Sequence, residues 1–125
     1  MPRVLVIEDN PDNLALATFL LESVGHTVLG ARDAEAGLTL ASDQRPDLVL
    51  MDIQLPGMDG LEATAMLKRD DATRDIPVIA LTALAMSGDE ERIRAAGCDG
   101  YIAKPWHYPD FLAAVAAQLE RSHAA

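Results

Sequence analysis

The feature that most constrains the fold is a regular alternation of short apolar runs with longer segments of helical periodicity. Five runs are predicted to be strands, namely Val4–Ile7, Thr27–Ala31, Leu48–Met51, Val78–Leu81 and Tyr101–Ala103. Helices are predicted at Asp12–Val24, Asp33–Asp43, Gly60–Arg69, Gly88–Ala96 and Pro109–Arg121. Four of the strands are almost continuously apolar, which is typical of parallel strands covered on both faces. Short loops and right-handed crossovers then predict an α/β fold, with a doubly wound five-stranded parallel sheet and five helices.

Length and charge limit the function further. A chain of 125 residues without a linker or repeat predicts a single domain over residues 1–125. Because 20 acidic residues oppose 10 basic ones, the net charge is −10, which argues against direct contact with nucleic acid or membrane. The single Cys98 cannot form an internal disulfide, and no signal or membrane-spanning segment is apparent. We therefore expect a cytoplasmic protein.

Reactive groups stand where the predicted strands end. Glu8 and Asp9 follow the first strand, Asp52 the third and Thr82 the fourth, while the fifth runs into Lys104. In sheets of this kind, ligands bind beyond the carboxyl ends of the strands. These side chains are therefore predicted to converge on a site for a metal ion or a phosphate group.

The residue types define the chemistry of this site. Three carboxylates cannot all stay ionised at close range without a counter-charge. Lys104 and one divalent cation would balance Glu8, Asp9 and Asp52, and oxygen ligands favour Mg²⁺. An aspartate is also a competent nucleophile that forms an acyl phosphate. Lys104 would neutralise the transferred group, and the Thr82 hydroxyl would bond one of its oxygens.

Taken singly, these residues have ordinary structural explanations. Acidic residues often begin helices, Asp52 precedes a Pro56-Gly57 turn, and threonine is common in strands. Their shared placement at strand ends, in this order, is what favours a functional site.

The motifs together identify a resemblance. They are Val-Ile-Glu8-Asp9-Asn10, Leu-Met-Asp52-Ile-Gln-Leu-Pro56-Gly57-Met-Asp-Gly60, Ala-Leu-Thr82-Ala83 and Tyr101-Ile-Ala-Lys104-Pro105. From Val4 to about Leu119 the chain resembles the receiver domains of two-component response regulators, and among them most closely the DivK-type single-domain regulators. The resemblance implies a flavodoxin-like sheet of order 2-1-3-4-5. It also implies a signalling switch, which catalyses only its own phosphorylation and dephosphorylation and has no output domain.

The resemblance further implies a role for each acidic residue. Asp52 would accept a phosphoryl group from a histidine kinase or a histidine phosphotransfer protein. Asp9, Asp52 and the backbone carbonyl of Gln54 would bind Mg²⁺, with Glu8 acting through a water molecule. Gln54 and Leu84 occupy the positions that tune the lifetime of the acyl phosphate in the family.

Other implied roles concern signal output. Lys104 would contact the phosphoryl group, with a cis peptide bond to Pro105. Thr82 and Tyr101 would form a switch pair that reports phosphorylation to a surface made of the fourth helix, the fifth strand and the fifth helix. A downstream protein would bind there.

Two alternatives remain open. The chain could be a receiver domain from a hybrid kinase or a larger regulator, whose output lies in the same polypeptide. A haloacid-dehalogenase-type phosphatase also phosphorylates a strand-end aspartate, but its chemistry needs a second acid two positions later, where this chain has Gln54.

The first predicted helix carries more apolar residues than one core-facing stripe needs. Helical spacing predicts that the sheet is covered by Leu16, Ala17, Leu20, Leu21 and Val24. The flanks and the outward face would then hold Leu14, Ala15, Thr18 and Phe19. Two interpretations are open: a broadly buried helix, or a docking patch for the helical bundle that carries the phosphohistidine.

Overall fold

The sheet predicted from the alternation is present. The computed structural model describes residues 2–83 and 89–123. Its strands are β1 (Arg3–Ile7), β2 (Thr27–Ala31), β3 (Leu48–Asp52), β4 (Val78–Thr82) and β5 (Gly100–Ala103). Its helices are α1 (Pro11–Ser23), α2 (Ala34–Gln44), α3 (Gly60–Arg69), α4 (Asp89–Ala95) and α5 (Tyr108–His123). All strand pairs are parallel, in the order β2-β1-β3-β4-β5, so the predicted fold class is confirmed.

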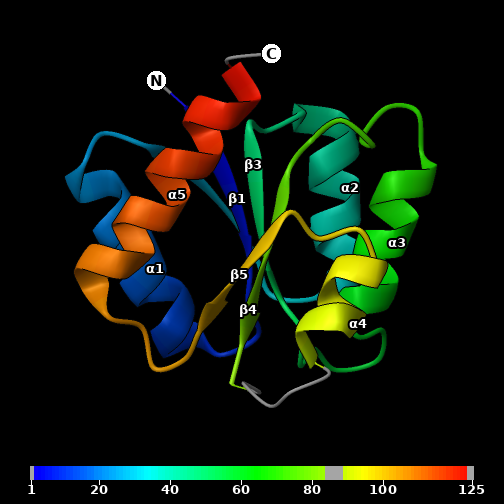
Figure 1. The fold of residues 1–125 in the computed structure, drawn as a ribbon, viewed down its shortest axis with the longest axis horizontal. Coiled ribbons are helices and arrows are strands. Elements are labelled where there is room, and N and C mark those ends of the chain that lie inside the picture. Colours follow the sequence, from blue (N-terminus) through cyan, green and yellow to red (C-terminus); the bar gives the residue numbers. More distant parts are fainter. Residues whose placement is uncertain (1, 84–88, 124–125) are drawn as a thin grey trace.

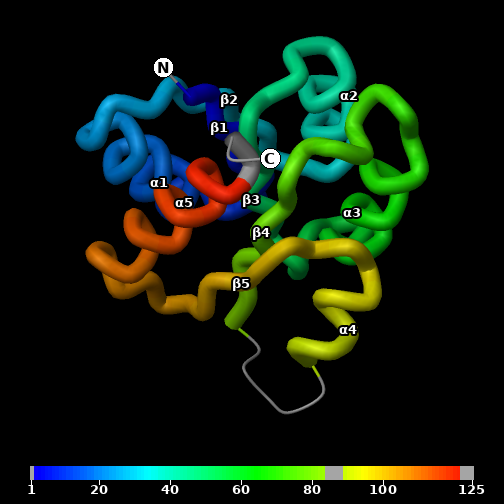
Figure 2. The backbone as a smooth tube through the Cα atoms, turned by 45° about the horizontal axis from the view of Figure 1, so that its top comes forward, coloured from blue at the N-terminus to red at the C-terminus, as the bar shows by residue number. Residues whose placement is uncertain are grey.

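Helices cover both faces of the sheet. Helices α1 and α5 lie on one face, and α2, α3 and α4 lie on the other (Figures 1 and 2). Alternate residues of β1 point to opposite faces of the sheet. Val4 and Val6 belong to the core cluster with Leu21 and Phe111, and Leu5 belongs to the cluster on the other face. Within the described part of the chain, no helix is both long enough and apolar enough to cross a membrane.

Several element boundaries differ from the prediction by one or two residues. Strands β3 and β4 each extend one residue further, so Asp52 and Thr82 are the last strand residues. Asp33 lies before α2 as its N-cap, where its side chain accepts the Ala36 N–H at 2.7 Å. The predicted start of the fourth helix, Gly88, lies outside the described residues.

The prediction that Val24, at the end of the first helix, packs on the sheet was wrong. Val24 is the C-cap of α1 and is 53% exposed, because Gly25 turns the chain with a φ of 93°. Leu14 is partly buried against the core, whereas Ala15 is exposed and Phe19 is 70% exposed. The helix therefore presents Phe19 to solvent, as the sequence indicated.

Candidate functional site

The parallel register brings the predicted residues to one edge of the sheet. Ile7 of β1 is paired with Met51 of β3, so Glu8 and Asp52 follow as neighbours at the next position. Asp52 is in turn paired with Leu81, the residue before Thr82. The strand order β1-β3-β4 is therefore enough to bring Glu8, Asp52 and Thr82 close together in space.

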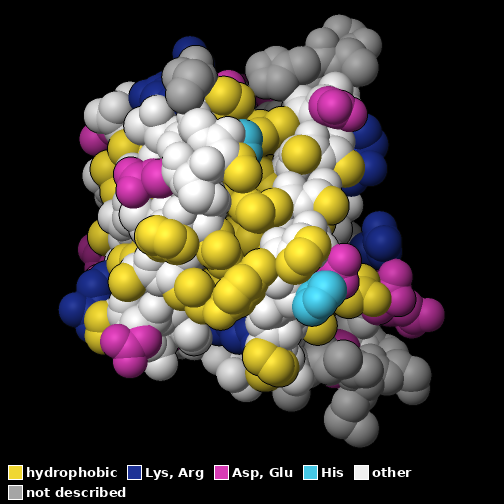
Figure 3. Space-filling model, turned by 90° about the vertical axis from the view of Figure 1, so that its left-hand side faces the viewer, with side chains coloured by type: hydrophobic (Ala, Val, Ile, Leu, Met, Phe, Trp, Pro, Cys, Tyr) yellow, Lys and Arg dark blue, Asp and Glu magenta, His cyan; other side chains and the backbone are white. Residues whose placement is uncertain are grey.

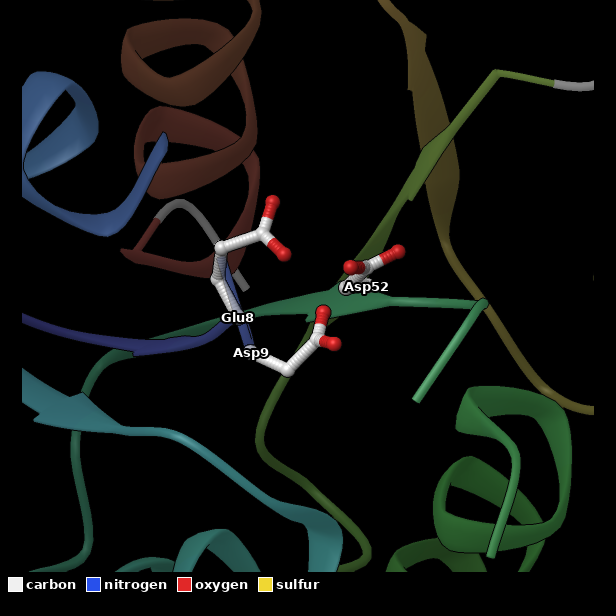
Figure 4. Close-up of side chains that lie close together, drawn as sticks. All are labelled: Glu8, Asp9 and Asp52. Atoms are coloured by element: carbon white, nitrogen blue, oxygen red, sulfur yellow. The ribbon is translucent and has the colours of Figure 1, made fainter. Parts of the chain in front are cut away.

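Three carboxylates meet at this edge. Oxygen atoms of Glu8, Asp9 and Asp52 lie within 4.8 Å of one another, and Figure 4 shows the three side chains pointing together from the ends of β1 and β3. Glu8 and Asp52 are buried, while Asp9 is partly exposed and gives access to solvent. A set of oxygen donors open on one side fits a hard cation such as Mg²⁺, which keeps several waters when it binds proteins.

Lys104 provides the positive charge. Its Nζ lies 2.7 Å from Glu8 Oε1 and 3.3 Å from Asp52 Oδ2. Its backbone N–H donates to the Thr82 carbonyl at 2.7 Å, which anchors the start of the β5–α5 loop to β4. The peptide bond from Lys104 to Pro105 is cis, as the resemblance implied.

The two buried carboxyl groups differ in proton affinity. Burial, a hydrogen bond with Glu8 and the charge of Glu8 raise the pKa of Asp52 to about 7, outweighing the Gln54 N–H and Lys104. Burial alone would also raise the pKa of Glu8, but hydrogen bonds from Asp52 and Lys104 outweigh it and lower that pKa. At neutral pH, Glu8 is therefore the ionised partner of Lys104, and Asp52 holds a proton part of the time.

The loop after β3 is fixed against Asp52. The Gln54 N–H donates to Asp52 Oδ1 at 3.0 Å, and the Gly60 N–H donates to the Ile53 carbonyl at 2.9 Å. A Cβ atom on Gly60 would lie 2.1 Å from the Asp52 carbonyl oxygen, so no larger residue fits there without backbone movement. The loop therefore holds the Gln54 backbone beside the cluster, and the Gln54 carbonyl as a metal ligand stays a prediction.

The two predicted switch residues lie on adjacent strands with different exposure. Thr82 is buried at the end of β4, and Tyr101 of β5 is 39% exposed. Tyr101 is paired with Ala80, two residues before Thr82. Leu84, which the resemblance implies would tune the lifetime of the acyl phosphate together with Gln54, lies outside the described residues.

Trp106 is the residue near the site that sequence reasoning missed. Its ring lies under the Lys104 ammonium, with Nζ 6.0 Å from the ring centroid. The signal available in the sequence was an aromatic residue two positions after the strand-end lysine. Its orientation could not be predicted, because it depends on packing against Phe111 of α5.

Comparison with known proteins agrees with this geometry. The sequence pattern of the family described as "Response regulator receiver domain" matches residues 4–116. The polar-differentiation response regulator DivK of Brucella anthropi is 50% identical over 120 residues, which are 95% of this chain and 98% of that protein.

Solved structures give the same result. The receiver domain of sensor histidine kinase PA1611 from Pseudomonas aeruginosa, which has magnesium coordinated in its active-site cleft, is 34% identical with a TM-score of 0.88. The match covers 95% of this chain and 98% of that one. A CheY-like receiver domain protein from Methanospirillum hungatei is 27% identical with a TM-score of 0.91, over 99% and 98% of the two chains. The chain therefore belongs to the response regulator receiver family.

Proposed function

We propose that Asp52 accepts a phosphoryl group from the phosphohistidine of a histidine kinase or a histidine phosphotransfer protein. An Asp52 oxygen forms a bond to phosphorus while the bond from phosphorus to the imidazole nitrogen breaks, and its electron pair stays on that nitrogen. The observation that carries this proposal is the convergence of Glu8, Asp9 and Asp52 within 4.8 Å, beside Lys104. Attack by water on the acyl phosphate would return the free aspartate.

In this proposal Asp9, Asp52 and the Gln54 carbonyl hold Mg²⁺, and Glu8 acts through a water molecule. The bound ion supplies positive charge that offsets the charge of the transferred group. Lys104 contributes a second positive charge, since its Nζ is already 3.3 Å from Asp52. The Thr82 hydroxyl, at the end of the neighbouring strand, bonds a phosphoryl oxygen.

A mass measurement tests the phosphorylation. The protein is incubated with acetyl phosphate and Mg²⁺, and its intact mass is recorded. One added phosphoryl group is expected, and the Asp52→Asn variant should gain none. A variant that is still modified would place the acceptor elsewhere. Asp9→Asn should slow the reaction, because it removes a proposed metal ligand. The nucleophile, Asp52, stays in place in this variant.

We further propose that the single receiver domain signals through protein contacts and is not an enzyme acting on other substrates. Support comes from the surface around β5, where Tyr101, Pro105, His107 and Asp110 line a groove of about 310 Å³. Tyr101 is the switch residue in that groove. A cytoplasmic location is part of the same proposal.

The proposed kinase contact lies on the α1–α5 side. Figure 3 shows hydrophobic side chains gathered over this face, with most charged side chains towards its margins. Among the large apolar side chains of the described residues, Phe19 of α1 is the most exposed. Closer to the site, a groove of about 380 Å³ is lined by Asn13, Leu16, Lys104 and Tyr108 among others. A helical bundle that carries a phosphohistidine would cover the apolar face and reach Asp52 past Lys104.

A further inference from the structure

We infer that Trp106 is a positioning residue, which holds the Lys104 ammonium in place for phosphoryl transfer by attraction to the face of its indole ring. The inference rests on the proposed function, in which Lys104 contacts the transferred group. The ammonium lies over the ring at 6.0 Å from its centroid, at the outer end of the range in which a cation is attracted by an aromatic face. Among aromatic side chains, tryptophan attracts a cation most strongly.

The ring is a rigid surface. Trp106 is only 8% exposed and belongs to the core cluster under α1 and α5. Its ring centroid lies 4.9 Å from that of Phe111, at an interplanar angle of 37°. Lys104, by contrast, ends in a flexible four-carbon chain with many rotamers. A fixed ring beneath the ammonium therefore restricts the side chain that has the freedom to leave the site.

Packing alone does not explain why an indole stands here. Its Nε1–H is buried, and no acceptor within the described residues bonds it. A buried donor without a partner is unfavourable, and a phenylalanine ring would pack against Phe111 without that donor. Packing thus favours phenylalanine at position 106, whereas attraction for a cation favours tryptophan.

The ring has a specific use during transfer. Before the reaction, Lys104 has two ionic partners, Glu8 and Asp52. When one Asp52 oxygen becomes bonded to phosphorus, the negative charge moves to the phosphoryl oxygens and the ammonium must follow it. The ring stays uncharged throughout, so it attracts the ammonium in both arrangements while Nζ remains above its face. It keeps Nζ near the reacting atoms while the ionic partners change.

A substitution inside the ring tests this inference. Trp106 is the only tryptophan in the chain, so growth on fluorinated tryptophans alters this ring and no other. Fluorine withdraws electron density from the ring face with little change in size. We expect the initial rate of Mg²⁺-dependent phosphorylation by acetyl phosphate to fall stepwise with the number of fluorines. The full loss should be about two- to fivefold, the factor expected for a cation contact of this strength. Equal rates across the series would overturn the inference.

A second measurement observes Lys104 directly. The chain has two lysines, and Lys68 on α3 serves as the internal reference. We expect the ε-methylene protons of Lys104 to show a ring-current shift that disappears in Trp106→Leu and is partly kept in Trp106→Phe. If Lys104 shows no such shift, the ring does not hold it. Should the leucine variant fail to fold, the fluorinated series decides alone.

The outcomes separate this inference from the proposed function. If the unaltered protein gains no phosphoryl group, the proposed function is contradicted, and so is this inference. If it is phosphorylated on Asp52 but fluorination leaves the rate unchanged, only the role of Trp106 is contradicted.

Discussion

The ammonium of Lys104 donates to Glu8 Oε1 at 2.7 Å, although the two residues are 96 positions apart in the sequence. Both side chains are withdrawn from solvent, so this charge-assisted bond is short and directional. Asp52 is the second, more distant partner at 3.3 Å. The lysine therefore stabilises the charge of Glu8 first, and burial leaves Asp52 with the raised pKa. A further cation near Asp52 is what would ionise the nucleophile fully.

Magnesium binding should depend on Asp9 and Asp52. Replacing either by asparagine removes a charged oxygen from a cluster whose members lie within 4.8 Å. We expect the affinity for Mg²⁺ to fall at least about tenfold in each variant, as each lost carboxylate weakens a hard-cation site. Titration monitored by Trp106 fluorescence measures it. Asp43→Asn, an exposed change on α2, is the matched control. Undiminished affinity in Asp9→Asn would exclude Asp9 as a ligand.

Magnesium affinity should also rise with pH. The pKa of Asp52 is raised to about 7, so protons compete with the cation below that pH. Between pH 6 and pH 8 we expect tighter binding and proton release on binding. Calorimetric titrations in two buffers of different ionisation enthalpy measure both. A pH-independent affinity without proton release would show that Asp52 is already ionised in the metal-free protein.

The raised pKa of Asp52 also predicts that the stability of the metal-free protein falls as the pH rises, whereas its affinity for Mg²⁺ increases. The ordinary pKa of an aspartate is 3.8, so between about pH 4 and pH 7 the folded protein keeps a proton that the unfolded chain has lost. Stability of the metal-free protein should fall across that window and stay low above it. Asp52→Asn removes this penalty and should stabilise the protein at pH 8 by up to about 4 kcal/mol.

Urea unfolding in the presence of EDTA checks this prediction at pH 8 and at pH 4. The gain should be present at pH 8 and nearly absent at pH 4, where the folded and unfolded states are protonated more alike. Asp43→Asn again serves as a control on an exposed carboxylate. An equal gain at both pH values would mean that asparagine acts through packing or hydrogen bonding and not through charge.

The convergence of the strand-end carboxylates could be predicted from the sequence, because it follows from the topology of the sheet. Once the strands are parallel and β1 lies beside β3, Glu8 and Asp52 must meet at the carboxyl edge. The asymmetry between these two carboxyl groups could not be predicted, since it depends on which oxygen Lys104 contacts more closely. The apolar periodicity of the sequence continues to Val24 and therefore places this residue in the core. The helix ends before it, because Gly25 turns the chain away.

Phe19 should contribute to recognition by the kinase and little to the fold. Its side chain is 70% exposed on α1, and α1 lies on the side of the molecule where Figure 3 shows hydrophobic side chains gathered. Phe19→Ser should therefore slow phosphoryl transfer from the cognate kinase about tenfold, the size of effect expected for losing an aromatic anchor at an interface. Phosphorylation by acetyl phosphate should be unchanged, because the variant leaves Asp52 and its neighbours intact.

Val24→Ser is the matched control for this experiment. Val24 is also exposed and lies at the end of α1 away from the carboxyl edge of the sheet, so its replacement should leave both routes unaffected. Phosphoryl transfer is followed with radiolabelled kinase, and thermal unfolding is recorded for each variant. If Phe19→Ser slows both routes and lowers the melting temperature, then Phe19 stabilises the fold. The kinase contact must then be sought around the groove at Leu16 and Tyr108.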